Sequence, residues 1–253
     1  MTVRARRWRS GVGGALCAGL AAVLIGCGSP DPDEGTNGLA QLPAETIEDR
    51  AREAAGDAEA LRLSGSVVTE GGSFRLDMRL GPEGGIGEVS TQGTTFELLR
   101  VGEELFIKAD AAFWEHQQVD SEEEAGLDSS PADKLVGKYV KVAPEDPAYE
   151  QLSGFTDKSV MLEGLLTLEG ERRTGERGEL GGVQTIQVVA SEGAGGVMEI
   201  SLIGTPYPMR LARGGEAGEL RMADWNKEFT LRAPKEDQVV DYGDQILKAG
   251  PED

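Results

Sequence analysis

The chain has 253 residues, with 45 acidic and 25 basic side chains, and its formal net charge is −20 at pH 7. Such an acidic protein repels phosphate backbones, so the composition argues against nucleic-acid binding and favours a well-hydrated surface. The two cysteines and the single histidine leave few side chains for disulfides, transition-metal ligation or thiol catalysis.

The N-terminal segment has the pattern of a secretory signal, residues 1–26. An apolar run from 12 to 25 follows a basic stretch that contains Arg4, Arg6, Arg7 and Arg9. The run is shorter than the roughly 20 residues that a membrane-spanning helix needs. It ends at Leu24-Ile25-Gly26-Cys27, which has the form of a bacterial lipobox. In proteins with this pattern the cysteine receives a diacylglyceryl group, with acyl chains such as palmitate, and becomes the first residue after cleavage.

Cys27 is therefore the predicted lipidation site, and two acyl chains give stable anchoring where one gives only marginal binding. We expect a lipid-anchored protein on the extracytoplasmic face of the cell membrane, and this anchor is its expected contact with the membrane. The alternative is a plain secreted protein with a chance cysteine. Residues 27–43 contain acids, glycines and prolines, which predict a flexible acidic tether ahead of a single domain at 44–253. Because Cys17 leaves with the signal, that domain has no thiol and its core alone must stabilise it.

The body opens with a predicted helix over 45–61, in which Ile47, Ala51, Ala54, Ala58 and Leu61 follow the spacing of one helical face. The period then changes to two. Strands are predicted over 61–69, 73–80, 86–91, 94–101 and 104–108, as an antiparallel meander.

The middle of the chain is predicted to hold an exposed loop over 121–130, a short helix over 131–135, a strand over 138–142 and a helix over 159–168. Further strands are predicted over 183–190, 197–203, 209–212, 219–223 and 228–232, before a mixed segment over 237–248. The order of helix, strands, helices and strands predicts an α+β fold.

This order, with the lipobox in front, resembles the LolA-like lipoproteins of actinobacteria, the LppX/LprA/LprF/LprG type. The local similarities are Phe113-Trp114, the stretches 137–142 and 207–211, and Asp224-Trp225-Asn226 with the residues up to 241. The resemblance implies a strongly curved antiparallel half-barrel sheet closed by a few helices. It also implies a hydrophobic cavity between sheet and helices, which some members use to carry lipids.

Apolar side chains on one strand face and one helix are the candidates for lining such a cavity: Phe74, Leu76, Met78, Leu80, Leu162, Leu165 and Leu166. Val160 is expected on the same helix. Each methylene of a ligand buried there would contribute roughly 0.8 kcal/mol. The pattern is equally that of a filled core, in which these side chains pack on one another.

The sequence offers no catalytic or metal-binding motif. His116 has no accompanying nucleophile elbow and is expected to be a partly exposed polar residue at a strand end. The acidic clusters at 103–104, 122–124 and 145–146 are expected to be solvated faces, and a glycosidase pair is remote. The predictions are therefore no enzyme, no cofactor and no metal.

The leading hypothesis is a membrane-anchored lipoprotein that binds or shuttles a lipid or other apolar ligand. The alternative is a non-enzymatic cell-surface interaction module with a packed core and no ligand. The sequence identifies no protein partner.

Overall fold

The computed structural model describes residues 33–69, 72–91, 94–117 and 135–241, and the fold below is that of these residues. The chain divides into two units, Met1–Glu34 and Gly35–Asp253. The second unit starts earlier than the predicted domain boundary at residue 44. Leu39, in the short 3-10 helix η1 (Leu39–Gln41), is 2% exposed and lies in the core. The Asn37 side-chain amide donates to the carbonyl oxygens of Ser201 and Gly204, which fixes this segment to the body.

The second unit contains helices and strands in the expected alternation. The helices are α1 (Ala44–Asp57), α2 (Ala111–Gln117), α4 (Pro147–Gly154) and α5 (Lys158–Leu165). The first strands are β1 (Leu61–Thr69), β2 (Gly72–Gly81), β3 (Gly84–Thr91), β4 (Thr94–Val101), β5 (Glu104–Ala109) and β6 (Tyr139–Val142). The later strands are β7 (Arg172–Leu180), β8 (Val183–Ala190), β9 (Val197–Ser201), β10 (Pro208–Ala212), β11 (Gly218–Ala223) and β12 (Val239–Asp241). Short 3-10 turns η2 (Ser191–Gly193), η3 (Gly214–Glu216) and η4 (Glu236–Gln238) complete the set.

Within the described residues the strands form one 12-stranded sheet in the order β12-β6-β5-β4-β3-β2-β1-β11-β10-β9-β8-β7. Neighbours are antiparallel except β12 and β6, which run parallel. The sheet does not close on itself, and β7 and β12 are its edges. The predicted α+β class and open half-barrel are confirmed.

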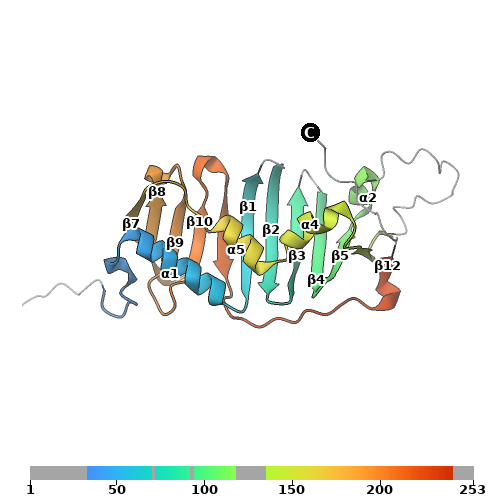
Figure 1. The fold of residues 1–253 in the computed structure, drawn as a ribbon, viewed down its shortest axis with the longest axis horizontal. Coiled ribbons are helices and arrows are strands. Elements are labelled where there is room, and N and C mark those ends of the chain that lie inside the picture. The colour runs from blue at the N-terminus through green and yellow to red at the C-terminus, as the bar shows by residue number, and fades with distance from the viewer. Residues whose placement is uncertain (1–32, 70–71, 92–93, 118–134, 242–253) are drawn as a thin grey trace, which may run out of the picture. The chain divides into compact units, whose positions relative to one another are not determined.

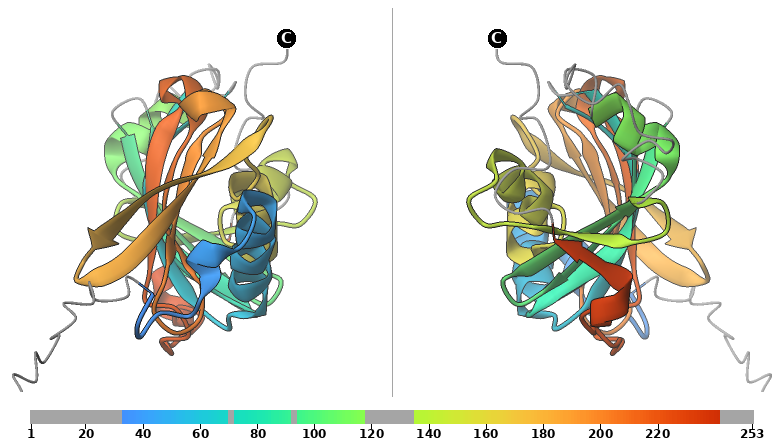
Figure 2. Two further views of the ribbon diagram at one scale, coloured as in Figure 1. Left: turned by 90° about the vertical axis from the view of Figure 1, so that its left-hand side faces the viewer. Right: turned by 90° about the vertical axis from the view of Figure 1, so that its right-hand side faces the viewer.

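The helices α1, α5 and α4 lie in a row across one face of the sheet (Figure 1). The two side views in Figure 2 place these three helices together on one side of the central strands, and none of the three covers the other side. We call these sides the helix-facing side and the outer face. Strand alternation sets the chemistry of each: on β2, the buried Leu76, Met78 and Leu80 face the helices, and three charged residues alternate with them on the outer face.

The predicted strands over 61–101 are found close to their expected bounds, whereas two predicted helices are shorter than expected. The first helix ends at Asp57, because Ala58 has an extended backbone. The second, α5, ends at Leu165. His116 lies within α2 rather than at the end of a strand, so that expectation is wrong. The predicted loop 121–130 and short helix 131–135 lie outside the described residues, apart from Leu135.

The predicted strand over 228–232 is wrong, since these residues form no ladder with a neighbouring strand. β11, which precedes them, already pairs with β1 and β10, so it offers no free edge. The chain instead runs through residues 228–238, a segment without strand pairing that ends in η4, along one end of the sheet towards β12 (Figure 1). We call this segment the strap. Phe229 packs beside Gly81, where an added Cβ would lie 3.4 Å from the ring.

Candidate functional site

The helix-facing side of the sheet is apolar across its central strands. The register pairs Met78 of β2 with Leu63 of β1 and with Gly87 of β3, so that these positions share one side. Leu98 of β4 and Ile107 of β5 continue the same row. All four side chains of this row, those of Leu63, Met78, Leu98 and Ile107, are 0% exposed. The row is therefore the floor on which the helices pack.

The structure brings the predicted cavity residues of β2 and α5 into one hydrophobic core. Leu162, Leu165 and Leu166 are at most 8% exposed. Phe74 is half-buried, and its ring lies 5.7 Å from that of Phe155, in the turn between α4 and α5. Val160 lies on α5 as expected, but it is 56% exposed and is not part of this core.

Helices and sheet meet closely in this arrangement. Met78 and Leu80 are 0% exposed, so no water-sized space lies against these two side chains. A ligand that entered between β2 and α5 would have to displace part of this packing. The predicted ligand-cavity residues thus form a coherent apolar group, and their role towards a ligand stays a prediction.

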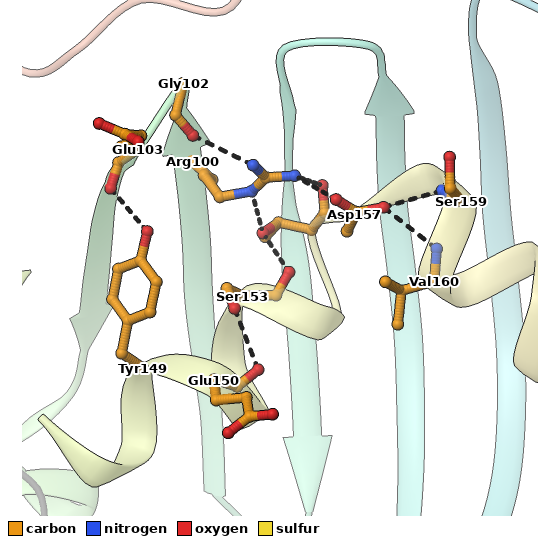
Figure 3. Close-up of polar contacts among 10 residues, drawn as sticks. Arg100, Gly102, Glu103, Tyr149, Glu150, Ser153, Asp157, Ser159 and Val160 are labelled. Atoms are coloured by element: carbon orange, nitrogen blue, oxygen red, sulfur yellow. Dashed lines mark hydrogen bonds and ion pairs between the residues drawn. The ribbon is translucent and has the colours of Figure 1, made fainter. Parts of the chain in front are cut away.

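A charged side chain on the helix-facing side holds the α4–α5 turn, residues 155–157, against the sheet. Arg100 lies two residues beyond Leu98 on β4 and is 16% exposed. Its Nε donates to Thr156 Oγ1 at 3.0 Å, and its Nη2 donates to the Thr156 carbonyl at 3.2 Å and the Asp157 carboxylate at 3.1 Å (Figure 3). Its Nη1 donates to the Gly102 carbonyl at 3.1 Å. One guanidinium therefore connects the β4–β5 turn with the turn between two helices.

A glycine on the neighbouring strand permits this close approach. A Cβ at Gly85 of β3 would lie 2.7 Å from Leu80 Cδ2 and 3.1 Å from the Thr156 carbonyl oxygen. Both distances are too short for ordinary packing, so a side chain here would move the α4–α5 turn away from the sheet.

The N-terminal ends of α4 and α5 are capped by side chains. Asp146 accepts a hydrogen bond from the Ala148 amide at the start of α4, where Pro147 is the first residue. Asp157 accepts from the Ser159 and Val160 amides at the start of α5 (Figure 3). Asp157 therefore serves as a helix cap and as the partner of Arg100 at once.

Two further polar contacts attach these helices to their surroundings. The Tyr149 hydroxyl donates to the Glu103 carbonyl at 2.7 Å, in the β4–β5 turn (Figure 3). Lys158 Nζ donates to the Gly56 and Ala58 carbonyls at 2.7 Å each, which places a cation at the C-terminal end of α1. The α4–α5 segment is thus attached at its beginning, at its turn and to α1.

A buried ion pair fixes α1 over the other end of the sheet. Glu48 is 4% exposed and accepts from Arg172 Nε at 2.7 Å. The hydrogen bond from this carboxylate raises the pKa of Arg172 above its ordinary value. Arg172 also donates to the Leu168 carbonyl, so α1 is joined to the segment that leads into β7.

A groove of about 400 Å³ runs between α1 and α5. Leu162 and Leu166 line it together with the charged residues Asp49, Arg52, Glu53, Lys158 and Glu163. Two of the predicted ligand-cavity residues can therefore be approached from solvent at this groove, although both are largely buried.

Within the described residues, no group of three or more histidine, cysteine, aspartate or glutamate side chains is arranged to hold a metal ion. Asp146, expected on a solvated face, is 3% exposed and caps α4, so that expectation is wrong. Cys27 lies outside the described residues, and its lipidation stays a prediction. No helix in the described ranges is both long and apolar enough to cross a membrane.

Sequence reasoning missed Arg100, the residue that joins the helices to the sheet. The signal was present in the alternation of β4, which places Phe96, Leu98 and Arg100 on one side. An arginine at the end of an apolar row requires an acceptor from the covering layer.

No family model and no curated protein matches the sequence. Solved structures do match it. LprF from Mycobacterium bovis has a TM-score of 0.51 and 14% sequence identity, over 76% of this chain and 96% of LprF. The lipoprotein LppX from Mycobacterium tuberculosis has a TM-score of 0.42 and 11% identity, over 75% of this chain and 98% of LppX. A lipoprotein-sorting protein domain from Vibrio parahaemolyticus has a TM-score of 0.25 and 10% identity, over 74% of this chain and 95% of that domain. The chain therefore has the LolA-like fold represented by LprF.

Proposed function

We propose that this chain is a membrane-anchored extracytoplasmic lipoprotein that binds or shuttles a lipid or other apolar ligand between its sheet and the helices α4 and α5. The observation that carries the proposal is an apolar sheet face covered by a helical layer whose central turn is held by one arginine, Arg100. The LprF-like fold supports the same interpretation.

The contacts between the sheet and the helices α4 and α5 are of kinds that can be exchanged when these helices shift to admit a ligand. The α5 side of the contact consists of leucines, which an acyl chain can replace without leaving a buried polar group unpaired. Several polar attachments end in solvent-accessible groups: Asp157 is 39% exposed, and the contacts of Lys158 with Gly56 and of Tyr149 with Glu103 lie at the surface. Thr156, which Arg100 also contacts, is buried. Water can therefore satisfy many of these groups when the helices shift.

Native mass spectrometry of the purified protein, with lipid extraction, tests whether a ligand is bound. We expect a mass increment that extraction removes, together with a lipid in the extract. Repeated absence of lipid from the native protein would argue strongly against the proposal.

A photoreactive fatty acid locates the ligand. We expect its adducts to map to Leu76, Met78 and Leu80 of β2. On the helical side we expect them at Leu162 and Leu165 of α5 and at Leu166, which caps this helix. The outer face of the same strand is the internal control: Arg75, Asp77 and Arg79 alternate with the apolar positions and should carry no adduct. Adducts confined to the outer face would contradict a ligand between sheet and helices.

The membrane anchor has a separate test. Cys27→Ser removes the predicted acylation site, and we expect the variant to move from the membrane fraction to the soluble fraction. Retention of the variant in membranes would refute the anchor, whether or not the domain binds lipid.

A second candidate, an interaction module with a packed core and no ligand, is favoured by the close packing of Met78 and Leu80. This candidate expects neither a co-purified lipid nor specific adducts in the core. The two experiments above therefore separate the two functions.

A further inference from the structure

The outer face carries an open groove of about 630 Å³ between the strap and strands β3–β6. Ile86 of β3 and Leu99 of β4 are its apolar floor, and the strap forms the facing wall with Arg232 and Lys235. The strap crosses this end of the sheet on its way to β12 (Figure 1). The groove therefore lies on the side of the sheet opposite the proposed ligand site.

The charge of this groove is the reverse of the charge of the chain. Lys108, Arg232 and Lys235 line it, and no aspartate or glutamate is among the described lining residues. In a chain with 45 acidic and 25 basic residues, the ordinary expectation is the opposite. None of these three cations forms an ion pair with a described carboxylate.

Tyr139 is the aromatic residue that lines the groove, and its contacts position one of the cations. The Tyr139 hydroxyl donates to the Glu97 carboxylate, and the Tyr139 ring meets Phe106 edge-on at 6.4 Å. Lys108 Nζ lies 5.2 Å from the centre of the Tyr139 ring, a cation–π contact that positions the ammonium without neutralising it. Burial and the hydrogen bond with Glu97 raise the pKa of Tyr139 to about 12, so the phenol is neutral at pH 7.

The strap that carries the other two cations is also attached. Lys138 Nζ donates to the Asp237 carbonyl at 2.7 Å, and β12 pairs with β6 directly after the strap. Arg232 and Lys235 therefore project from a segment that is fixed at its end, which limits the entropy lost when they bind a ligand.

The net charge of −20 does not prevent anion binding in the groove. At physiological ionic strength the Debye length is about 8 Å, so distant carboxylates are largely screened. The three cations that line the groove act within that distance, as does Glu97, whose carboxylate is engaged by the Tyr139 hydroxyl.

We propose that this groove binds a phosphate ester, with Lys108, Arg232 and Lys235 around the phosphate and its carbon skeleton against Ile86 and Leu99. A phosphate offers several strong acceptor oxygens, and the planar fork of an arginine matches them in pairs. The volume suits a small molecule or a lipid headgroup rather than a folded acidic protein. The ester is a free metabolite or a phospholipid headgroup, and both present the same chemistry.

Isothermal titration of the full chain carrying Cys27→Ser with glycerol phosphate tests the proposal, with glycerol as the uncharged reference. The double variant Arg232→Gln/Lys235→Gln removes two groove cations, and we expect binding at least about tenfold weaker, or about 1.4 kcal/mol. The matched control is Arg50→Gln/Arg173→Gln, which makes the same change in net charge on α1 and β7 and should leave affinity within about twofold. Lys108→Gln should weaken binding in the same direction as the double variant.

Vesicles distinguish the two sources of phosphate. The same Cys27→Ser chain is sedimented with mixed vesicles of phosphatidylcholine and phosphatidylglycerol and, separately, with pure phosphatidylcholine vesicles. Binding to the mixed vesicles alone supports a lipid headgroup, provided that the groove variant abolishes this binding. Binding of glycerol phosphate without vesicle binding supports a soluble ester. The proposal is overturned by absence of binding to both probes, by equal loss in the groove and control variants, or by tighter binding of a polyglutamate peptide than of glycerol phosphate.

Discussion

Replacing Arg100 with glutamine tests whether this arginine holds the α4–α5 turn to the sheet. The guanidinium is 16% exposed and donates hydrogen bonds of 3.0–3.2 Å to Thr156, Asp157 and the Gly102 carbonyl. Hydrogen bonds to charged groups contribute roughly 1.5–3 kcal/mol each in mutational series, and such contributions do not add for one side chain. Asp157 is 39% exposed and can be hydrated once the arginine is lost. We therefore expect Arg100→Gln to cost about 2 kcal/mol, near the lower end of that range.

The loss should be concentrated in the helical layer. The free energy of opening α4 and α5 should fall by the full amount of about 2 kcal/mol. Their backbone amides should therefore exchange hydrogen about 30-fold faster than in the parent chain. The central strands β1 and β2, which exchange through larger openings, should change less. The melting temperature should fall by about 4–8 °C if unfolding is two-state. Hydrogen exchange followed by peptide mass spectrometry resolves the segment 147–165 from the strands.

The matched control is Arg62→Gln on the outer face. Arg62 and Asp77 form an ion pair whose side chains are 42% and 46% exposed, and such surface pairs contribute about 0–1 kcal/mol. We expect no selective change in the exchange of α4 and α5 in this control. If Arg100→Gln behaved like Arg62→Gln, or if exchange rose uniformly across the sheet, the role assigned to Arg100 would be refuted.

Three further changes probe the same architecture. Gly85→Ala should destabilise the chain by about 1–3 kcal/mol, because the added Cβ would meet Leu80 and Thr156. Its control, Gly56→Ala on α1, has open space and should be neutral or stabilising by up to about 1 kcal/mol. Urea unfolding compares the stabilities of the two variants. Glu48→Gln should lower stability by about 1–3 kcal/mol, because it leaves the partly buried Arg172 without its carboxylate, and a normal melting temperature would contradict this. Tyr139 has a folded-state pKa of about 12, above its ordinary value of 10.0, so its contribution is complete below pH 10 and is lost as pH rises from 10 to 12. The stability of Tyr139→Phe should therefore decline less over that interval, as measured by denaturant titration at each pH.

The strands of the meander could be predicted from sequence because each has one buried side. In β2 the order Phe74-Arg75-Leu76-Asp77-Met78 alternates strictly, and the structure buries the apolar positions as that alternation requires. A shift of one residue would put the charged side chains into the core, so the pattern fixes the register as well as the strand.

β7 could not be predicted in the same way, because it has no apolar face. Its sequence, RRTGERGEL, is mostly exposed, and it forms a strand through its hydrogen bonds with β8 at the edge of the sheet. Its charges and its irregular register between Thr174 and Arg177 are typical of an edge that avoids pairing with another chain. The strap shows the opposite error. Its alternating Phe229 and Leu231 predict a strand, but β11, which precedes the strap, already pairs with a strand on each side.

The candidate site was only half predictable. The apolar residues of β2 and α5 were identified because burial leaves a periodic signal. Helix α4 was missed, although Asp146 followed by Pro147 is a recognisable helix start. The contact of Arg100 with Asp157 joins residues far apart in the chain, and no local pattern names the partner of a charge on an apolar face.

The two proposed sites use opposite sides of the same strands, which makes them separable by experiment. On β4, Leu98 packs under the helices and its neighbour Leu99 lines the outer groove, and on β5 the same holds for Ile107 and Lys108. Because consecutive side chains of a strand point to opposite faces, Lys108→Gln changes the groove without removing an atom from the helix-facing core. A variant that loses phosphate binding and keeps its lipid would therefore establish two independent sites. Loss of both activities together in Lys108→Gln would mean that the sheet couples its two faces.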